Sequence, residues 1–546
     1  MRSVLGPPRT TRSQGAGRGN LGWANLGWAT ARTAPTAEAE AGGAVPAYLT
    51  ARVRSVDEYI NGVQVVRHGE QQRHTDVTLT FAVGSRDETL RTIGVAHALE
   101  HLVMYTVRDL PIEMNAEVDL LTTTFVASGS TARVGEFLNR LCRALAAPPV
   151  DRLDLEARVL TAEEGNVAHP VVALLLNVRY GARGPGLAWL EGPGYDGLTP
   201  EHVISFANEW FVPANAVLQV TGPLPEGLEL ALPSGPAPAR VLPVARSFDG
   251  PVVVGHGIPA SGVLLTLPPD DDVRLSTLSI MTLRQRIEEK CRFVGGHSYE
   301  IGVDLVAGPG GASDWIVYAE AREGSEDAVS RAVVAALTDL AENGPTAAEL
   351  AHQIARAEEN LVATDDPEVR RAFSNAMSRI IGEPELPSVS ATRLAAVQSS
   401  DIAAVLKTAL PGAIGYGDEH ALEVWQAAGF TLAAACPVIA ELPEGRTFKP
   451  PLTARAFVKE ARSMLWVRTD DALVLRDADG IHQIRWDEVA GVMRSPDGMT
   501  LVFGTNGCTI PVDPDMFRGA TVVLEELTRR VPSELWFDES KLTSDD

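Results

Sequence analysis

Hydrophobic and polar positions along the chain change between two periods, and their order predicts the fold. Residues 51–70 and 74–85 alternate apolar with polar side chains and are rich in β-branched residues, which predicts two β-strands, with a turn at Asn61-Gly62 in the first segment. A helical spacing of apolar residues follows over about 93–106. The pattern then predicts a strand at 115–129, helices at 134–148, 151–167 and 198–211, and a strand at 215–225.

A second segment repeats this order of elements. It follows a proline-rich connector at 231–251 and predicts a strand, a helix, two strands and two helices. Segments 49–230 and 252–430 are of similar size, so we expect an internal duplication of one α+β domain. The H-x-x-E-H pattern described below occurs in the first copy and is absent from the second, which predicts one site and not two.

The two ends of the chain differ from these domains. After a linker at 431–455, residues 456–540 show short strands separated by Asp- and Gly-containing turns and a helix near 518–531, which predicts a small, mostly-β domain. Residues 1–48 are arginine-rich with no acidic residue before Glu38, and we expect a disordered tail. Whether this tail belongs to the mature protein stays open.

Composition narrows the classes of function. The chain has 546 residues and a formal net charge of −24, which argues against nucleic acid as a partner because phosphate binding needs a basic surface. Its 4 cysteines are widely spaced without a C-x-x-C pair, so we expect no disulfide framework and a reducing, cytoplasmic location. No apolar run reaches the ~18 residues of a membrane span.

Three residues in the stretch GVAHALEHLVMYT carry the chemistry. His97 and His101 are four residues apart on the predicted helix, so both imidazoles lie on one face and can reach a single ion. Catalytic zinc takes three protein ligands and keeps one position for water. Glu100, beside His101, is placed to accept a proton from that water as a general base.

A third ligand has to come from another segment. Glu156 and Glu163 are seven residues apart, two helical turns on one face. Glu163 is a candidate ligand, and Glu156 is placed one layer behind it to hold a histidine. Glu164 is an equally available alternative for the ligand.

These residues resemble those of the pitrilysin/insulinase zinc metallopeptidases, whose inverted zinc motif is H-x-x-E-H. Four further features are similar to that family: Gly94, the sequence HALEHLVMYT around the motif, a strand that begins at Asn115-Ala116, and the spacing of Glu156 and Glu163. The resemblance covers about 50–425 and is strongest in the first half. The separation of His101 and Glu163, 163 − 101 = 62 residues, is shorter than usual in the family.

The resemblance implies a zinc endopeptidase with His97, His101 and Glu163 as ligands, Glu100 as general base and Glu156 behind the ligands. Asn115 and Ala116 would bind an extended peptide as an edge strand. Tyr299 would bind the substrate carbonyl together with an arginine; Glu288 occupies the arginine's expected place, leaving Arg286 or Arg292 as substitutes.

The family encloses short or unfolded peptides in a chamber of four such units. A chain with two of them implies a homodimer or a heterodimer with a related subunit. The alternative function is a catalytically inactive assembly subunit that partners an active homologue. The C-terminal domain resembles pleckstrin-homology-like or GRAM-like domains, and docking on protein is favoured over lipid because its turns are acidic.

Overall fold

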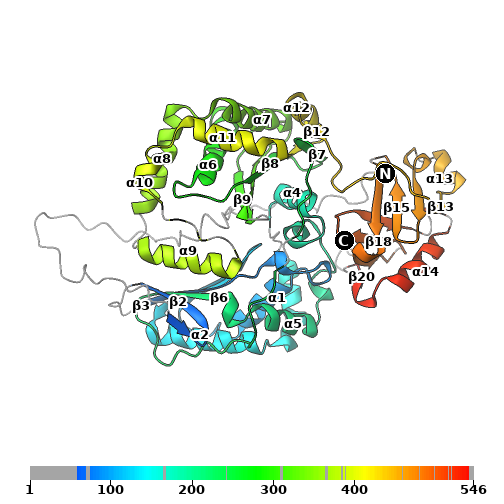
Figure 1. The fold of residues 1–546 in the computed structure, drawn as a ribbon. Helices are drawn as coiled ribbons and strands as arrows, with labels where there is room; N and C mark the ends of the chain where they lie inside the picture. Colours follow the sequence, from blue (N-terminus) through cyan, green and yellow to red (C-terminus); the bar gives the residue numbers. More distant parts are fainter. Residues whose placement is uncertain are drawn as a thin grey trace, which may run out of the picture.

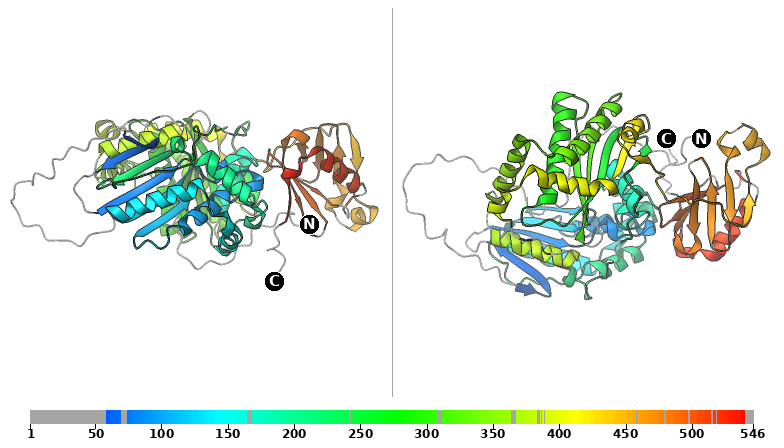
Figure 2. Two further views of the ribbon diagram at one scale, coloured as in Figure 1. Left: turned by 90° about the horizontal axis from the view of Figure 1, so that it is seen from below. Right: turned by 45° about the horizontal axis from the view of Figure 1, so that its top comes forward.

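The computed structural model describes residues 58–539, apart from breaks at 69–73, 164–167, 241–242, 308–310, 363–366, 383–384, 386, 388, 458, 479, 497, 514–515 and 518. Two α+β lobes face each other, and a smaller β-rich module lies beside them (Figures 1 and 2). The tail at 1–48 lies outside the described residues. No helix in the described part of the chain is long and apolar enough to span a membrane.

The first lobe is built on a six-stranded sheet in the order β1-β2-β6-β3-β5-β4. Its opening hairpin turns at Asn61 and Gly62, both with positive φ (48° and 87°), as an Asn-Gly turn requires. The strands are β1 (Glu58–Ile60), β2 (Val63–His68), β3 (His74–Phe81), β4 (Glu113–Val118), β5 (Thr123–Ser130) and β6 (Ala216–Thr221). One predicted strand over 115–129 is therefore wrong, because a turn at 119–122 divides it into the antiparallel pair β4 and β5.

Four helices accompany this sheet: α1 (Val95–Tyr105), α2 (Thr131–Ala146), α3 (Leu153–Ala162) and α5 (Pro200–Trp210). Their apolar faces join the sheet in one core that includes Phe81, Leu99, Phe125 and Phe211. Helix α3 ends at Ala162, five residues before the predicted end at 167. Glu163 therefore lies at the helix C-cap.

The second lobe repeats the strand pairing of the first. Its strands are β7 (Val252–His256), β8 (Ala260–Leu267), β9 (Ile301–Ala307), β10 (Ser313–Glu320), β11 (Ile414–Asp418) and β12 (Thr431–Leu432), in the order β12-β7-β11-β8-β10-β9. In each sheet a parallel pair (β2–β6, β7–β11) is followed by three antiparallel partners. The two lobes thus share the pairing of five strands, whereas the sixth differs: β1 pairs antiparallel with β2, and β12 pairs parallel with β7.

The helices of the second lobe are α6 (Leu275–Glu288), α7 (Glu326–Asn343), α8 (Ala347–Val362), α10 (Ala391–Leu394), α11 (Ser399–Ala409) and α12 (Leu422–Ala427). Together with the sheet they bury a second core around Leu283, Val317, Leu337 and Trp425.

Each sheet is covered on its other face by a helix from the opposite half of the sequence (Figure 1). Helix α4 (Pro170–Tyr180), apolar on nearly all sides, packs on the second sheet, where Val171 and Leu175 join the core around Leu264 and Tyr416. Helix α9 (Pro367–Ile381) packs on the first sheet through a cluster that includes Val66, Val217, Phe373 and Met377. The lobes are thereby interlocked.

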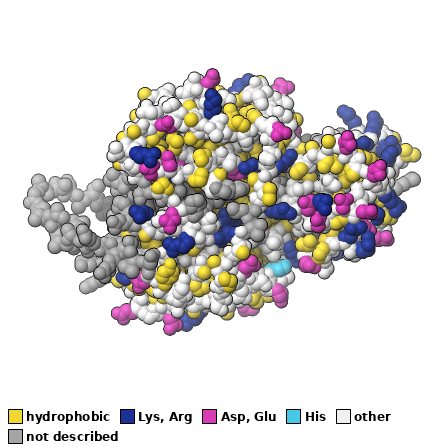
Figure 3. All heavy atoms as spheres, viewed as in Figure 1, with side chains coloured by type: hydrophobic (Ala, Val, Ile, Leu, Met, Phe, Trp, Pro, Cys, Tyr) yellow, Lys and Arg dark blue, Asp and Glu magenta, His cyan; other side chains and the backbone are white. Residues whose placement is uncertain are grey.

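The C-terminal module contains two four-stranded sheets and a helix. The sheets are β13 (Arg446–Phe448), β14 (Leu465–Arg468), β15 (Ala472–Arg476) and β16 (Ile481–Arg485), and β17 (Val489–Arg494), β18 (Thr500–Gly504), β19 (Thr509–Val512) and β20 (Trp536–Asp538). Helix α14 (Ala520–Arg530) packs in their shared core, and the short helix α13 (Leu452–Phe457) precedes β14. On the face drawn in Figure 3, acidic and basic side chains are interspersed.

The module contacts the first lobe close to the start of α1. Leu501, Phe503 and Phe537 of the module form an apolar cluster with Leu90 and Leu187 of the first lobe. The turn between β18 and β19 also approaches the end of α4, where the Ala182 N–H donates to the Thr505 carbonyl at 3.2 Å. Gly181 (φ +68°) has no space for a side chain, because a Cβ would lie 2.4 Å from that carbonyl oxygen.

Asp314 fastens α4 to the second sheet from a fully buried position. Its carboxylate accepts hydrogen bonds from Arg179 Nε (3.3 Å), the Tyr180 hydroxyl and Thr266 Oγ1 (2.6 Å). Burial and the adjacent carboxylate raise the pKa of Tyr180, so this hydroxyl stays a donor. These three hydrogen bonds stabilise the packing of α4 on the second sheet, because the buried carboxylate has donors for both of its oxygens.

We expect Asp314→Ala to lower the free energy of unfolding by about 3 kcal/mol, because it leaves Arg179 buried without this carboxylate. Urea unfolding measures the loss. Asp327→Ala is the control: its ion pair with Arg331 is exposed and should contribute less than about 0.5 kcal/mol. Equal losses in the two variants would contradict the assignment of Asp314 to the interlock.

Candidate metal centre

The start of α1 is held by a buried carboxylate. Gly94 begins the helix with φ +88°, and Glu88 accepts the backbone N–H groups of Gly94 (2.9 Å) and Ala96 (3.0 Å). These are N–H groups that a helix leaves without partners at its N-terminus. Burial raises the pKa of Glu88 to about 8, against the two backbone hydrogen bonds, which lower it. The helix thus starts at a defined residue.

His97 and His101 follow one turn apart, with ring centroids 4.9 Å from each other. Tyr195, from the loop before α5, places its hydroxyl 3.1 Å from His97 Nδ1. Gly94 makes room for that ring, since a Cβ there would lie 2.6 Å from Tyr195 Cε1. The hydrogen bond at Nδ1 leaves Nε2 of His97 as the nitrogen that faces the other site residues.

Glu163 brings a carboxylate to both histidines. Its Oε2 atom lies 3.3 Å from His101 Nε2 and 3.8 Å from His97 Nε2. Ligand atoms bound to tetrahedral zinc at ~2.1 Å are separated from one another by roughly 3.4 Å. The distances of this carboxylate oxygen from the two imidazole nitrogens are close to that separation, so the three side chains suit a zinc site. Glu164, the alternative ligand, lies outside the described residues.

Glu156 stands behind His101. Its Oε2 atom lies 3.6 Å from His101 Nδ1, and its Oε1 atom accepts a hydrogen bond from Arg152 at 2.8 Å. The Arg152 guanidinium in turn stacks on the Tyr105 ring, 3.3 Å from its centroid. This chain of contacts orients the His101 ring so that Nε2 points toward Glu163.

Glu100 lies on the same face of α1 and is buried, with Oε2 3.7 Å from His97 Nε2. Burial raises the pKa of its carboxyl group to about 7, with His101 opposing and Glu163 adding to that rise. Burial also lowers the pKa of His97, as does the neighbouring His101, which favours the neutral imidazole that a metal needs. Donor atoms of His97, Glu100 and His101 lie within 4.8 Å of one another, so Glu100 is adjacent to the two imidazoles.

Asn115 and Ala116 lie on β4, the edge strand of the first sheet, and α1 packs against this strand. Ala116 packs on the core, whereas Asn115 is exposed. An edge strand offers unpaired backbone groups to an added chain.

Tyr299 does not join the histidines through any contact in the described residues. It precedes β9 (Ile301–Ala307), and it is 82% exposed beside the Arg292 guanidinium. Arg286 is engaged elsewhere, with Glu349 at 2.7 Å and Asp339 at 2.6 Å. Glu288 pairs with Arg292 at 3.3 Å.

Sequence reasoning missed Glu88, Arg152 and Tyr195. Glu88 and Arg152 have a signal in the chain: an acid before a glycine that starts a helix, and a base four residues before Glu156. Tyr195 lies 98 residues from His97, and nothing local in the sequence links the two.

Known proteins resemble the chain in part. No family model matches the sequence. Coenzyme PQQ synthesis protein F of Pseudomonas protegens is 26% identical over 226 residues, which are 34% of this chain and 26% of that protein. The match therefore spans about a quarter of the relative's length.

Solved structures share the fold over much more of the chain. A protease from Helicobacter pylori superposes with a TM-score of 0.52 at 16% identity, over 66% of this chain and 97% of its own. An M16 peptidase inactive domain from Pseudomonas fluorescens gives 0.50 at 15% identity, over 70% and 98%. The periplasmic protease PqqL from Escherichia coli gives 0.50 at 15%, over 82% and 57%. The chain thus has the α+β fold of the pitrilysin-like M16 peptidases, as the sequence predicts.

Proposed function

We propose that the protein is a zinc-dependent metallopeptidase of the pitrilysin type, with His97, His101 and Glu163 as the zinc ligands. The observation that carries this proposal is the convergence of His97 Nε2 and His101 Nε2, from α1, with Glu163 Oε2, from the C-cap of α3. Separate support comes from the far nitrogens of the two rings, where Tyr195 is hydrogen-bonded to His97 Nδ1 and Glu156 lies 3.6 Å from His101 Nδ1.

A zinc ion held by His97, His101 and Glu163 would supply an activated water and a positive charge that polarises a peptide carbonyl. Glu100 holds the proton of that water and passes it to the leaving amine. Its burial beside the histidines suits this role, because a general base works best when its pKa is near the operating pH. Glu156 keeps the His101 ring in place and touches no reacting atom.

The substrate would be a short or unfolded peptide that extends β4 as an added strand along Asn115 and Ala116. Support comes from the position of β4 at the sheet edge and its packing against α1, which carries His97 and His101. Backbone hydrogen bonds of this kind are independent of side-chain identity. Tyr299 would contact the substrate carbonyl together with residues of a partner chain.

We also propose a domain organisation for the chain. We divide the chain into a catalytic domain (49–230), a non-catalytic domain (252–430), a connector at 231–251 and a pleckstrin-homology-like module. The bounds predicted for the second connector (431–455) and the module (456–540) need correction, because β12 (Thr431–Leu432) pairs in the second lobe and β13 (Arg446–Phe448) pairs in the module. Two lobes supply half of a four-domain chamber, so we propose a homodimer or a related partner subunit. A cytoplasmic location is proposed as well.

An inactive assembly subunit remains the second candidate, because one structural neighbour is named an inactive M16 domain and Glu288 stands where the arginine is expected. The presence of Glu100 favours an active enzyme. Wild-type protein that binds zinc yet cleaves no peptide, alone or with a related subunit, would decide for the inactive subunit.

Zinc affinity distinguishes the roles of Glu156, in the first turn of α3, and Glu163, at its C-cap. We expect Glu163→Gln to weaken zinc binding by at least ~100-fold, and Glu156→Gln by ~10–100-fold, the range for residues that orient a ligand. Glu164→Gln is the matched control and should bind as the wild type does. Titration against a chromogenic chelator measures all three, and weakened binding by Glu164→Gln alone would transfer the ligand role.

Glu100→Gln tests the general base. We expect kcat on a quenched peptide library to fall ~10²–10⁴-fold, because no group then takes the water's proton, while zinc affinity stays unchanged. Glu201→Gln, an exposed residue on α5, should behave as the wild type. Full peptidase activity in Glu100→Gln would contradict the role of Glu100 as the general base.

Edge-strand binding predicts dependence on the substrate backbone. Peptides N-methylated at alternate residues should raise KM about tenfold or more, because each lost hydrogen bond costs about 0.5–1.5 kcal/mol. The series methylated in the other register is the matched control, since an edge strand pairs with every second residue. Equal KM values for both series would contradict strand addition.

A further inference from the structure

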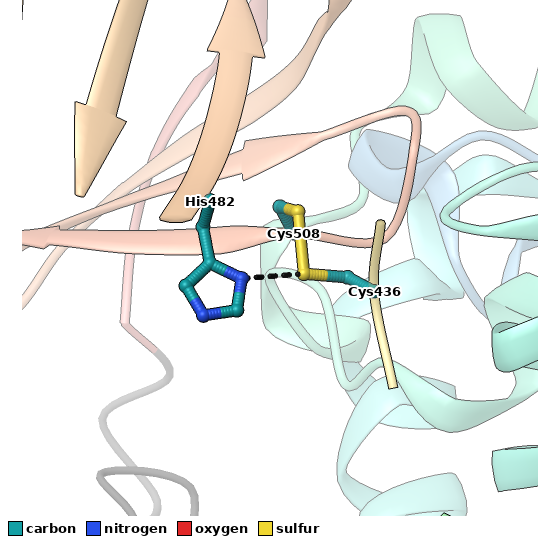
Figure 4. Close-up of side chains that lie close together, drawn as sticks. All are labelled: Cys436, His482 and Cys508. Atoms are coloured by element: carbon teal, nitrogen blue, oxygen red, sulfur yellow. Dashed lines mark hydrogen bonds between the residues drawn. A yellow bond between two sulfur atoms is a disulfide. The ribbon is translucent and has the colours of Figure 1, made fainter. Parts of the chain in front are cut away.

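Cys436 and Cys508 meet although they are 72 residues apart, which corrects the expectation that no cysteines pair. Their Cα atoms are 5.1 Å apart, within the range of disulfides, and the two sulfurs are bonded (Figure 4). Cys436 is half-buried in the segment after β12, and Cys508 is buried in the turn between β18 and β19. The bond therefore joins the connector to the module.

A histidine adjoins one sulfur. His482, on β16, places Nδ1 3.2 Å from Cys436 Sγ, and its Nε2 lies 3.3 Å from Asp477 Oδ1 (Figure 4). These are the titratable groups with described contacts to the sulfur pair. An imidazole held by a carboxylate stabilises a thiolate beside it. The two free cysteines lack this stabilisation of the thiolate. Burial raises the pKa of Cys142 to about 12 and that of Cys291 to about 11.

The bond lies where the module meets the lobes. Just before Cys436, the carbonyls of Ala434 and Ala435 accept hydrogen bonds from Arg246, each at 3.1 Å. Just before Cys508, Thr505 receives hydrogen bonds from the Ala182 N–H (3.2 Å) and from Arg183 (2.7 Å). Both ends of the bond are thus fixed to the body of the protein.

We propose that Cys436 and Cys508 form a redox-active pair that exchanges with a dithiol reductant and, when oxidised, fastens the C-terminal module to the lobes. A thiolate of the reductant attacks the more accessible Cys436 sulfur, and Cys508 leaves as a thiolate and takes a proton. The second thiol of the reductant then displaces Cys436, whose thiolate is held by protonated His482. Two electrons and two protons pass to the protein, and the reductant becomes a disulfide.

A metal would be the other use of two sulfurs and an imidazole. Structural zinc takes four protein ligands, however, and the second nitrogen of His482 faces Asp477, which leaves three. A reversible disulfide also suits a compartment that contains thiol reductants, where lasting structural disulfides are rare. The proposal does not depend on peptidase activity.

Thiol mapping tests the pair in the full-length wild-type protein. Protein purified without reductant, denatured and alkylated, should carry label on Cys142 and Cys291 only; after treatment with dithiothreitol, all 4 cysteines should react. Label on all four before reduction, persisting after treatment with an oxidised dithiol, would overturn the proposal. So would an equivalent of zinc that is present in the wild type and lost in Cys508→Ser.

The role of His482 has its own readout. In the reduced protein, the pH midpoint for alkylation of Cys436 should lie below the ~8.5 of a free thiol. His482→Gln should return it to that value and slow re-formation of the disulfide at pH 7 about tenfold. His352→Gln, an exposed histidine on α8, is the control. Wild-type rates in His482→Gln would exclude the histidine from the pair.

Discussion

The geometry of the site depends on where α1 begins. An α-helix turns about 100° per residue, so a start displaced by one residue would rotate both histidines away from Glu163. Glu88 prevents this displacement, because its two oxygens take the N–H groups of Gly94 and Ala96. Gly94 contributes the left-handed conformation and the open space for Tyr195. A buried carboxylate that contacts neither histidine thus sets the register of the site.

The C-terminal module also contacts the segment in which α1 begins. Its apolar contact with Leu90 lies on the short 3-10 turn Leu90–Thr92, between Glu88 and the start of α1. The residues that define the helix start are therefore supported from one side by Glu88 and from the other by Phe503 and Phe537. Whatever loosens the module acts on the segment next to the histidines.

Much of this arrangement could be predicted from the sequence, because it is local. Helix periodicity places His97 and His101 on one face, and the seven-residue spacing places Glu156 and Glu163 together. The repeated order of elements anticipates two α+β units. The turn at 119–122 could not be predicted from its residues, because it contains no Gly or Pro and lies between the β-branched residues Val118 and Thr123. The Tyr195 contact and the Cys436–Cys508 bond depend on tertiary contacts between distant segments, which local sequence spacing does not predict.

The interlocked helices limit how the chain can move. Separating the two lobes would strip α4 from the second sheet and α9 from the first, exposing both apolar clusters to water. Hinge motion at the proline-rich connector is thereby made costly, although the connector itself is long enough to permit it. The two lobes therefore move as one rigid body. A large substrate would have to enter through movement of this body relative to another molecule.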